Sequence, residues 1–96
     1  MLMSKVSRQV VIRNRLGLHA RPAMQFVDLA NKVEATIKVH KGGDEPVEAD
    51  GKSVMQMIIV AATEGTPLRI DAEGPDAQQA VDELARLVES GFGEET

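Results

Sequence analysis

Length, composition and charge already limit what this chain of 96 residues can be. A chain of this size buries one hydrophobic core, and without cysteine it can form neither a disulfide nor a thiolate metal site. Its formal net charge of −4 and its two aromatic residues, Phe26 and Phe92, argue against a nucleic-acid-binding protein. We therefore expect a single domain over residues 1–96 that binds no nucleic acid.

Charge is unevenly distributed along the chain. Residues 1–52 hold nine Lys and Arg against six Asp and Glu, a net charge of +3, whereas residues 53–96 hold two against nine, a net charge of −7. The basic half places Arg13, Arg15 and Arg21 within nine positions, which suits a small anionic group better than a long polyanion. No apolar run approaches the ~20 residues of a membrane span, and the N-terminus lacks the apolar core of a secretory signal. We expect a cytoplasmic protein without membrane insertion.

The first half of the chain predicts a strand, a helix and a second strand, in that order. Alternating apolar residues predict a strand over residues 6–12, interrupted at Arg8, and residues 14–17 form a loop. Apolar residues at three-to-four spacing predict a helix over residues 20–31. Regular alternation over residues 35–40 then predicts a second strand that is buried on one face.

The middle of the chain predicts two more strands with a short helix between them. A Gly-Gly-Asp turn leads to a third strand over residues 47–50, and a fourth strand follows over residues 68–72. Between them, Ser53 and Gln56 match the capping box, in which each side chain satisfies a free backbone amide at a helix start. The apolar run behind them fits a helix or a strand by its period, but the cap and the Met and Ala content favour a short helix to about Ala62.

A second amphipathic helix is expected near the C-terminus. Gly74-Pro75-Asp76 is expected to open it, with the proline in its first turn and the acid near the positive end of the helix dipole. Apolar residues between Ala77 and Val88 form its buried stripe, and Gly91 ends it. The order of elements is then βαββαβα. One sheet with helices over one face is the economical way to bury these apolar stripes.

The stretch Gly-Leu-His-Ala-Arg-Pro-Ala at residues 17–23 combines residues suited to phosphoryl chemistry. Gly17 permits a tight turn, and Pro22 is tolerated only in the first turn of a helix, so His19 must lie near the N-cap. The free amides of that helix end, together with Arg21, form an anion site. A neutral His19 there can attack a phosphoryl group, whose negative charge the helix end and Arg21 would stabilise.

These residues also have simpler interpretations. His19 could be only a polar helix cap, and Arg21 only a solvated cation, although a cation in the first turn opposes the helix dipole. His19 and His40 could in principle hold a metal ion, but the neighbouring Arg21 and the lack of a third ligand argue against it. We expect neither a metal nor a cofactor.

The histidine motif at residues 17–23, followed about thirty residues later by Lys-Ser-Val-Met at residues 52–55, resembles HPr, the histidine-containing phosphocarrier family of the bacterial phosphotransferase system. The resemblance covers essentially the whole chain. It implies an α+β open-faced β-sandwich, with a four-stranded antiparallel sheet and three helices on one face. It also implies that His19 accepts a phosphoryl group on Nδ1 (the pros nitrogen) from enzyme I, itself charged by phosphoenolpyruvate, and passes it to an enzyme IIA-type acceptor.

Two departures from the family pattern bear on where the phosphoryl group goes. Leu16 stands where many sugar-branch members carry a small polar residue, and residues 14–17 and 89–92 look closer to the nitrogen-related, regulatory branch. The helix after Ser53 also lacks the glycine that many Gram-positive members have after Met55. These departures leave phosphoryl carriage untouched but weaken sugar transport as its destination.

Ser53 has two interpretations. As a helix cap it contributes ~1 kcal/mol to stability. The resemblance implies instead phosphorylation by an HPr kinase/phosphorylase, which would damp transfer through His19, and a helix N-terminus accepts phosphoserine readily. The alternative function is accordingly a regulatory protein-binding module that is controlled at Ser53, with phosphorylation of His19 secondary.

A carrier that fits donors and acceptors of different shape needs a modest apolar surface beside its nucleophile, and methionine adapts well to several partners. We expect a monomer that presents His19 to other proteins, since so small a chain leaves little room for a substrate cleft. The alternative for the apolar residues is that they are ordinary core. The expected docking patch consists of Ala20, Met24, Val54, Met55 and Ile58.

Overall fold

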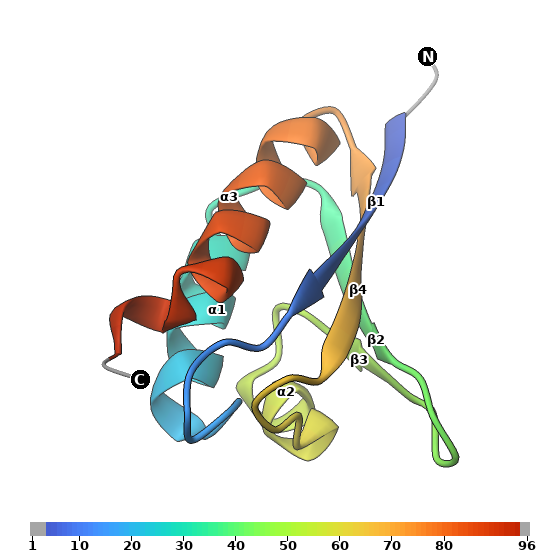
Figure 1. Ribbon diagram of the computed structural model, residues 1–96. Helices are drawn as coiled ribbons and strands as arrows, with labels where there is room; N and C mark the ends of the chain where they lie inside the picture. Colours follow the sequence, from blue (N-terminus) through green and yellow to red (C-terminus); the bar gives the residue numbers. More distant parts are fainter. Residues whose placement is uncertain (1–3, 95–96) are drawn as a thin grey trace.

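The computed structural model describes residues 4–94 as one antiparallel sheet with helices packed on one of its faces (Figure 1). Met1–Met3, at the N-terminus considered above for a secretory signal, lie outside the described residues. The predicted α+β open-faced β-sandwich is confirmed. Its elements in chain order are β1 (Ser4–Val11), α1 (Ala20–Ala30), β2 (Thr36–Lys41), β3 (Val47–Asp50), α2 (Val54–Val60), β4 (Pro67–Gly74), α3 (Ala77–Glu89) and the 3₁₀ turn η1 (Gly91–Gly93).

The sheet has the strand order β1-β4-β2-β3, and every neighbouring pair is antiparallel. Alternate side chains of the two central strands point under the helices, while their neighbours face solvent on the helix-free side, as period-two alternation requires. Each helix contributes a fully buried side chain to the same core, Phe26 from α1, Met57 from α2 and Leu84 from α3. In residues 4–94, none of the helices has the length and apolar character needed to cross a membrane.

Arg8, which interrupts the apolar alternation of β1, lies at the edge of the sheet. Its guanidinium reaches α3, where it lies 3.2 Å from the Glu89 carboxylate and 3.6 Å from that of Asp82. An edge strand leaves room for such a side chain beside the covering helix, so the charge is paired rather than buried. β1 ends at Val11, one residue earlier than predicted. The amide of Ile12 lies outside the sheet and donates to the Thr66 carbonyl at 3.0 Å.

The start of α2 has half of the predicted capping box. Ser53 is the N-cap, and its Oγ accepts from the Gln56 amide at 3.3 Å. The reciprocal bond is absent, because the Ser53 amide already donates to the Asp50 carbonyl and the Gln56 side chain accepts from the Asp50 amide instead. The helix ends at Val60, earlier than predicted, where Ala61 turns into the left-handed region at φ 51°.

The start of α3 differs from the sequence prediction. Pro75 precedes the helix rather than occupying its first turn, because Asp76 is the N-cap. The Asp76 carboxylate does not cap its own helix but accepts the backbone amides of Glu34 and Ala35, each at 2.9 Å. The hydrogen bond from the Glu34 amide is the main reason that the pKa of Asp76 falls below its ordinary value of 3.8. The carboxylate therefore joins the start of α3 to the loop before β2.

Candidate functional site

The loop that leads into α1 is shaped by Gly17. Its φ is +71°, and a Cβ at this position would lie 2.4 Å from the Ala62 carbonyl oxygen, so no other residue fits without moving backbone. The Leu18 amide donates to that same carbonyl at 2.8 Å, and the Gly17 amide donates to the Asn14 carbonyl at 3.1 Å. The turn thus holds the histidine motif against the segment that follows α2.

His19 is the N-cap residue of α1, the position that Pro22 in the first turn predicts. Its backbone is extended, and its side chain makes no hydrogen bond to its own helix. The amides of Ala20 and Arg21 find no hydrogen-bond partner within residues 4–94, and the first turn contains no acidic residue. This helix end therefore presents free N–H groups and uncompensated positive partial charge beside the imidazole.

Glu94, which the sequence analysis did not single out, contacts the His19 ring. Glu94 directly follows η1, and Nε2 of His19 lies 2.9 Å from Oε2 and 3.2 Å from Oε1 of Glu94. The Glu94 side chain is 16% exposed, so solvent screens this contact only in part. An ionised carboxylate can only accept hydrogen bonds, so Nε2 is the donor in this contact, and in the neutral ring the lone pair is then on Nδ1. No local motif signals this contact, because the two residues are 75 positions apart.

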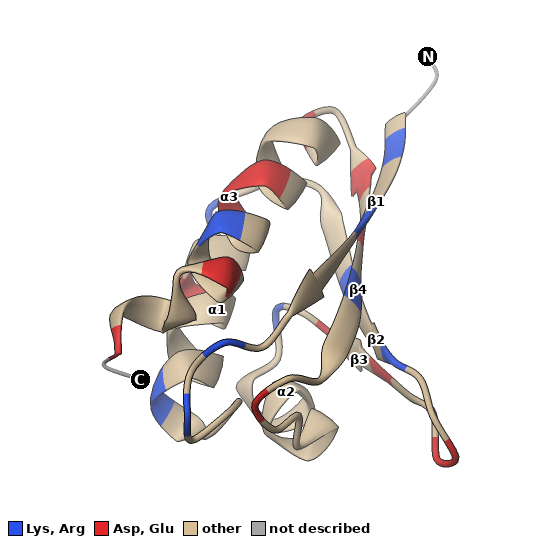
Figure 2. Cartoon of the chain, in the orientation of Figure 1, with Lys and Arg blue, Asp and Glu red and all other residues tan. Residues whose placement is uncertain are grey.

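Positive charge gathers around this helix end. Figure 2 shows basic segments in the loop between β1 and α1 and in the first turn of α1. These are the predicted cluster of Arg13, Arg15 and Arg21, all of which are exposed. Within residues 4–94 none of the three forms an ion pair with a carboxylate. The surface beside His19 is therefore free to attract an anion.

The expected docking patch is largely exposed. Met24, Met55 and Ile58 have relative exposures of 53%, 75% and 41%, so these three are not core residues. Ala20 is also exposed, whereas Val54 is half-buried against the core. Two further large apolar side chains that were not predicted as part of the patch are exposed, Leu16 in the loop before α1 and Ile59 in α2.

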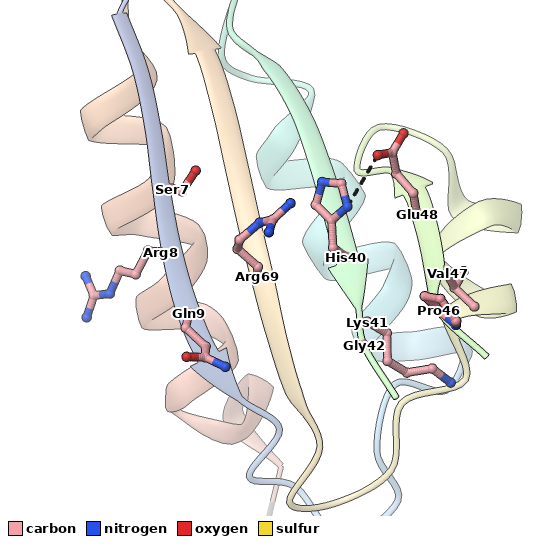
Figure 3. Close-up of a pocket in the computed structure, with 10 residues that line it drawn as sticks. All are labelled: Ser7, Arg8, Gln9, His40, Lys41, Gly42, Pro46, Val47, Glu48 and Arg69. Atoms are coloured by element: carbon pink, nitrogen blue, oxygen red, sulfur yellow. Dashed lines mark ion pairs between the residues drawn. The ribbon is translucent and has the colours of Figure 1, made fainter. Parts of the chain in front are cut away.

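The second histidine, His40, lies elsewhere, in a shallow hollow on the helix-free face of the sheet (Figure 3). Its Nδ1 is 3.3 Å from Glu48, and its Nε2 is 2.9 Å from Asp71 without the alignment of a hydrogen bond. Burial raises the pKa of Asp71, but hydrogen bonds from Ser7 and Arg69 outweigh it and bring the pKa below 3.8. Within the described chain, no group of three or more His, Asp or Glu residues is arranged to hold a metal ion, and His19 and His40 do not meet.

Comparison with known proteins agrees with this arrangement. The family described as "PTS HPr component phosphorylation site" matches residues 6–90. The phosphocarrier protein NPr of Proteus mirabilis is 42% identical over 92% of this chain and 96% of its own, and the phosphocarrier protein HPr of Cupriavidus necator is 35% identical over 93% and 97%. The crystal structure of HPr-C-His from Thermoanaerobacter tengcongensis superposes with a TM-score of 0.83 at 36% identity, covering 95% of this chain and 99% of that one. The chain with His19 at the N-cap of α1 thus belongs to the HPr family of phosphocarrier proteins of the phosphotransferase system.

Proposed function

We propose that this protein accepts a phosphoryl group from enzyme I on Nδ1 of His19 and passes it to an acceptor of the enzyme IIA type. The observation that carries the proposal is the position of His19 at the N-cap of α1 together with the contact of its ring with Glu94. Its Nε2 is engaged by Glu94, which leaves Nδ1 as the nucleophile, and its backbone begins the helix whose first amides are free. Enzyme I and the acceptors are partners that the family resemblance implies.

The transfer is a displacement at phosphorus. The Nδ1 lone pair forms a bond to phosphorus while the bond from phosphorus to the donor breaks, and that electron pair stays with the donor. The amides of Ala20 and Arg21 and the Arg21 guanidinium then stabilise the phosphoryl oxygens. The proton remains on Nε2, where the Glu94 carboxylate balances the positive charge that the ring gains. Onward transfer runs the same step in reverse.

The destination we propose is the nitrogen-related, regulatory branch. The NPr relative at 42% identity and the residues 14–17 and 89–92 support this assignment. The exposed part of the docking patch would bind enzyme I and the acceptors in turn, because its methionines adapt to different partners. We propose that the protein acts as a cytoplasmic monomer formed by a single domain over residues 1–96. The alternative, a binding module controlled at Ser53, gains no separate support, since the Ser53 hydroxyl serves as the cap of α2.

The experiment is incubation with enzyme I and phosphoenolpyruvate, followed by phosphopeptide mapping. We expect a label on the peptide that contains His19, and this label should be acid-labile and alkali-stable, as a phosphoramidate is. Label that survives in His19→Ala would contradict the proposal. Reconstituted transfer to a panel of sugar-branch and nitrogen-branch acceptors then tests the destination, and an HPr kinase added to the same mixture tests Ser53.

A further inference from the structure

A buried asparagine donates to the same carboxylate that contacts the His19 ring, and phosphoryl transfer as proposed makes no use of it. Asn14 is fully buried, and it is the one buried polar or charged residue within residues 4–94. Its Nδ2 donates to the Gly17 carbonyl at 2.7 Å and to Oε1 of Glu94 at 2.9 Å, while its Oδ1 is buried without a partner. Burying an amide with an unsatisfied oxygen is costly, so the position calls for an explanation beyond packing.

The contacts form a chain that ends at the reacting group. Asn14 binds Oε1 of Glu94, and His19 Nε2 is 2.9 Å from the other oxygen, Oε2. Because Asn14 holds Oε1 and His19 Nε2 contacts both oxygens, rotating the carboxylate plane would lengthen at least one of these contacts. The imidazole bound to it is then restricted in both its rotation and its tautomer. The second hydrogen bond of Asn14, to the Gly17 carbonyl, connects this series of contacts to the loop before α1.

We propose that Asn14 and Glu94 are positioning residues for phosphoryl transfer. Asn14 orients the Glu94 carboxylate, and Glu94 holds the His19 ring with its proton on Nε2 and its Nδ1 lone pair facing the first amides of α1. This inference rests on the proposed function for its effect on rate, but the ring orientation itself is independent of any donor. A purely structural role for Asn14, as a staple of the loop through Gly17, would change stability and leave the ring unaffected.

The test uses the full chain labelled with ¹⁵N and the variants Glu94→Gln and Asn14→Asp. Asn14→Asp keeps the shape of the side chain but removes the donor and sets two carboxylates side by side. Glu45→Gln and Asn31→Asp are matched controls, since Glu45 is exposed in the loop between β2 and β3 and Asn31 at the end of α1. Ring ¹⁵N spectra report the tautomer and the exchange protection of the Nε2 proton, and His40 in the same spectra serves as an internal reference. Thermal melting reports the stability of each variant.

We expect the wild type and both controls to show a protected Nε2 proton on His19, and Glu94→Gln and Asn14→Asp to lose it. Phosphorylation by enzyme I should slow roughly tenfold or more in these two variants, because a charge-assisted hydrogen bond is lost at the nucleophile. Unchanged ring spectra with lowered melting would overturn the proposal in favour of a loop staple. Altered ring spectra with wild-type rates would overturn it as well. A wild-type chain that enzyme I does not phosphorylate would instead contradict the proposed function, while the ring spectra would still decide the positioning.

Discussion

The two histidines of this protein both lie against carboxylates, yet their surroundings differ. His40 sits within a strand and has a carboxylate near each ring nitrogen, Asp71 near Nε2 and Glu48 near Nδ1. His19 has Glu94 near Nε2, and no partner of its Nδ1 is found within residues 4–94. A neighbouring carboxylate therefore does not by itself make a histidine a nucleophile. A ring nitrogen that keeps its lone pair beside a helix N-terminus has what phosphoryl transfer needs.

The surfaces around the two histidines differ in their ion pairs and in their exposed apolar side chains. On the sheet face, Lys38 is paired with Glu48 at 3.3 Å and Arg69 with Asp71 at 3.1 Å. Around His19, the three arginines form no ion pair within the described chain. In residues 4–94, the large exposed apolar side chains lie on α1, on α2 and in the loop before α1, and none lies on a strand. One face is suited to water and the other to an anion and to partner proteins.

The sharpest test of this comparison is to remove each histidine. His19→Ala should abolish phosphorylation by enzyme I, because the nucleophile is lost, and His40→Ala should leave the rate of phosphorylation unchanged. We expect His40→Ala to lower the melting temperature more than His19→Ala does, since His40 links carboxylates on β3 and β4. Rates from radiolabelled phosphoenolpyruvate and melting by circular dichroism measure the two effects. Loss of transfer in folded His40→Ala would break the comparison.

Replacing Gly17 should destabilise the fold. Gly17→Ala places a Cβ 2.4 Å from a backbone oxygen at a φ of +71°, whereas Gly43→Ala adds a Cβ with no heavy atom within 4 Å at a φ of +104°. Both variants carry left-handed strain of ~1–2 kcal/mol, and only Gly17→Ala must also move backbone. Its melting temperature should therefore fall further than that of Gly43→Ala. Equal melting temperatures would show that the loop before α1 yields easily.

Arg21 should matter for transfer more than for folding. Arg21→Ala removes a charge-assisted donor to the phosphoryl group, which is worth ~1.5–3 kcal/mol, or a rate loss of roughly tenfold to a hundredfold. Because the side chain is exposed, stability should change by less than ~0.5 kcal/mol. Arg69→Ala on the sheet face is the control, and it should leave phosphorylation kinetics unchanged. A fully active or an unfolded Arg21→Ala would contradict the assignment.

Two neighbouring methionines separate docking from packing. Met55 is 75% exposed, so Met55→Asp should melt like the wild type and bind enzyme I several-fold more weakly, as measured by calorimetry. Met57 has no exposed surface, and Met57→Asp should unfold the domain because it buries an unpaired carboxylate. Cooperative unfolding of Met55→Asp at a clearly lower temperature would remove that residue from the docking patch.

The smallest expected effect concerns Asp71 beside His40. Hydrogen bonds from Ser7 and Arg69 hold the folded pKa of Asp71 below 3.8, so its ionised form stabilises the fold. This contribution is present above the unfolded value and is lost as the pH falls through the lower folded value. Asp71→Asn should therefore melt below the wild type at pH 7, and the difference should shrink in strong acid. A difference that is independent of pH would assign the effect to packing rather than to charge.

Local rules predicted much of this molecule. The order βαββαβα follows from apolar periodicity, and Pro22 alone places His19 near a helix start, because proline lacks the amide that an inner turn needs. The Ser-x-x-Gln pattern of residues 53–56 likewise predicted that Ser53 caps a helix. The local rule was wrong at α3, where Pro75 precedes the helix instead of lying in its first turn, and the Asp76 carboxylate binds amides of another loop.

Sequence alone predicted the residue that we propose as the nucleophile, the helix end that would receive the anion and the position that requires a glycine, since each depends on neighbours within a few positions. Only the tertiary structure decided what contacts the other side of the imidazole. Glu94 and Asn14 are 80 positions apart and meet at His19 because η1 and the loop before α1 converge there. No periodicity or short motif encodes such a contact, because it depends on how α3 packs against the sheet and carries the C-terminal segment back to α1.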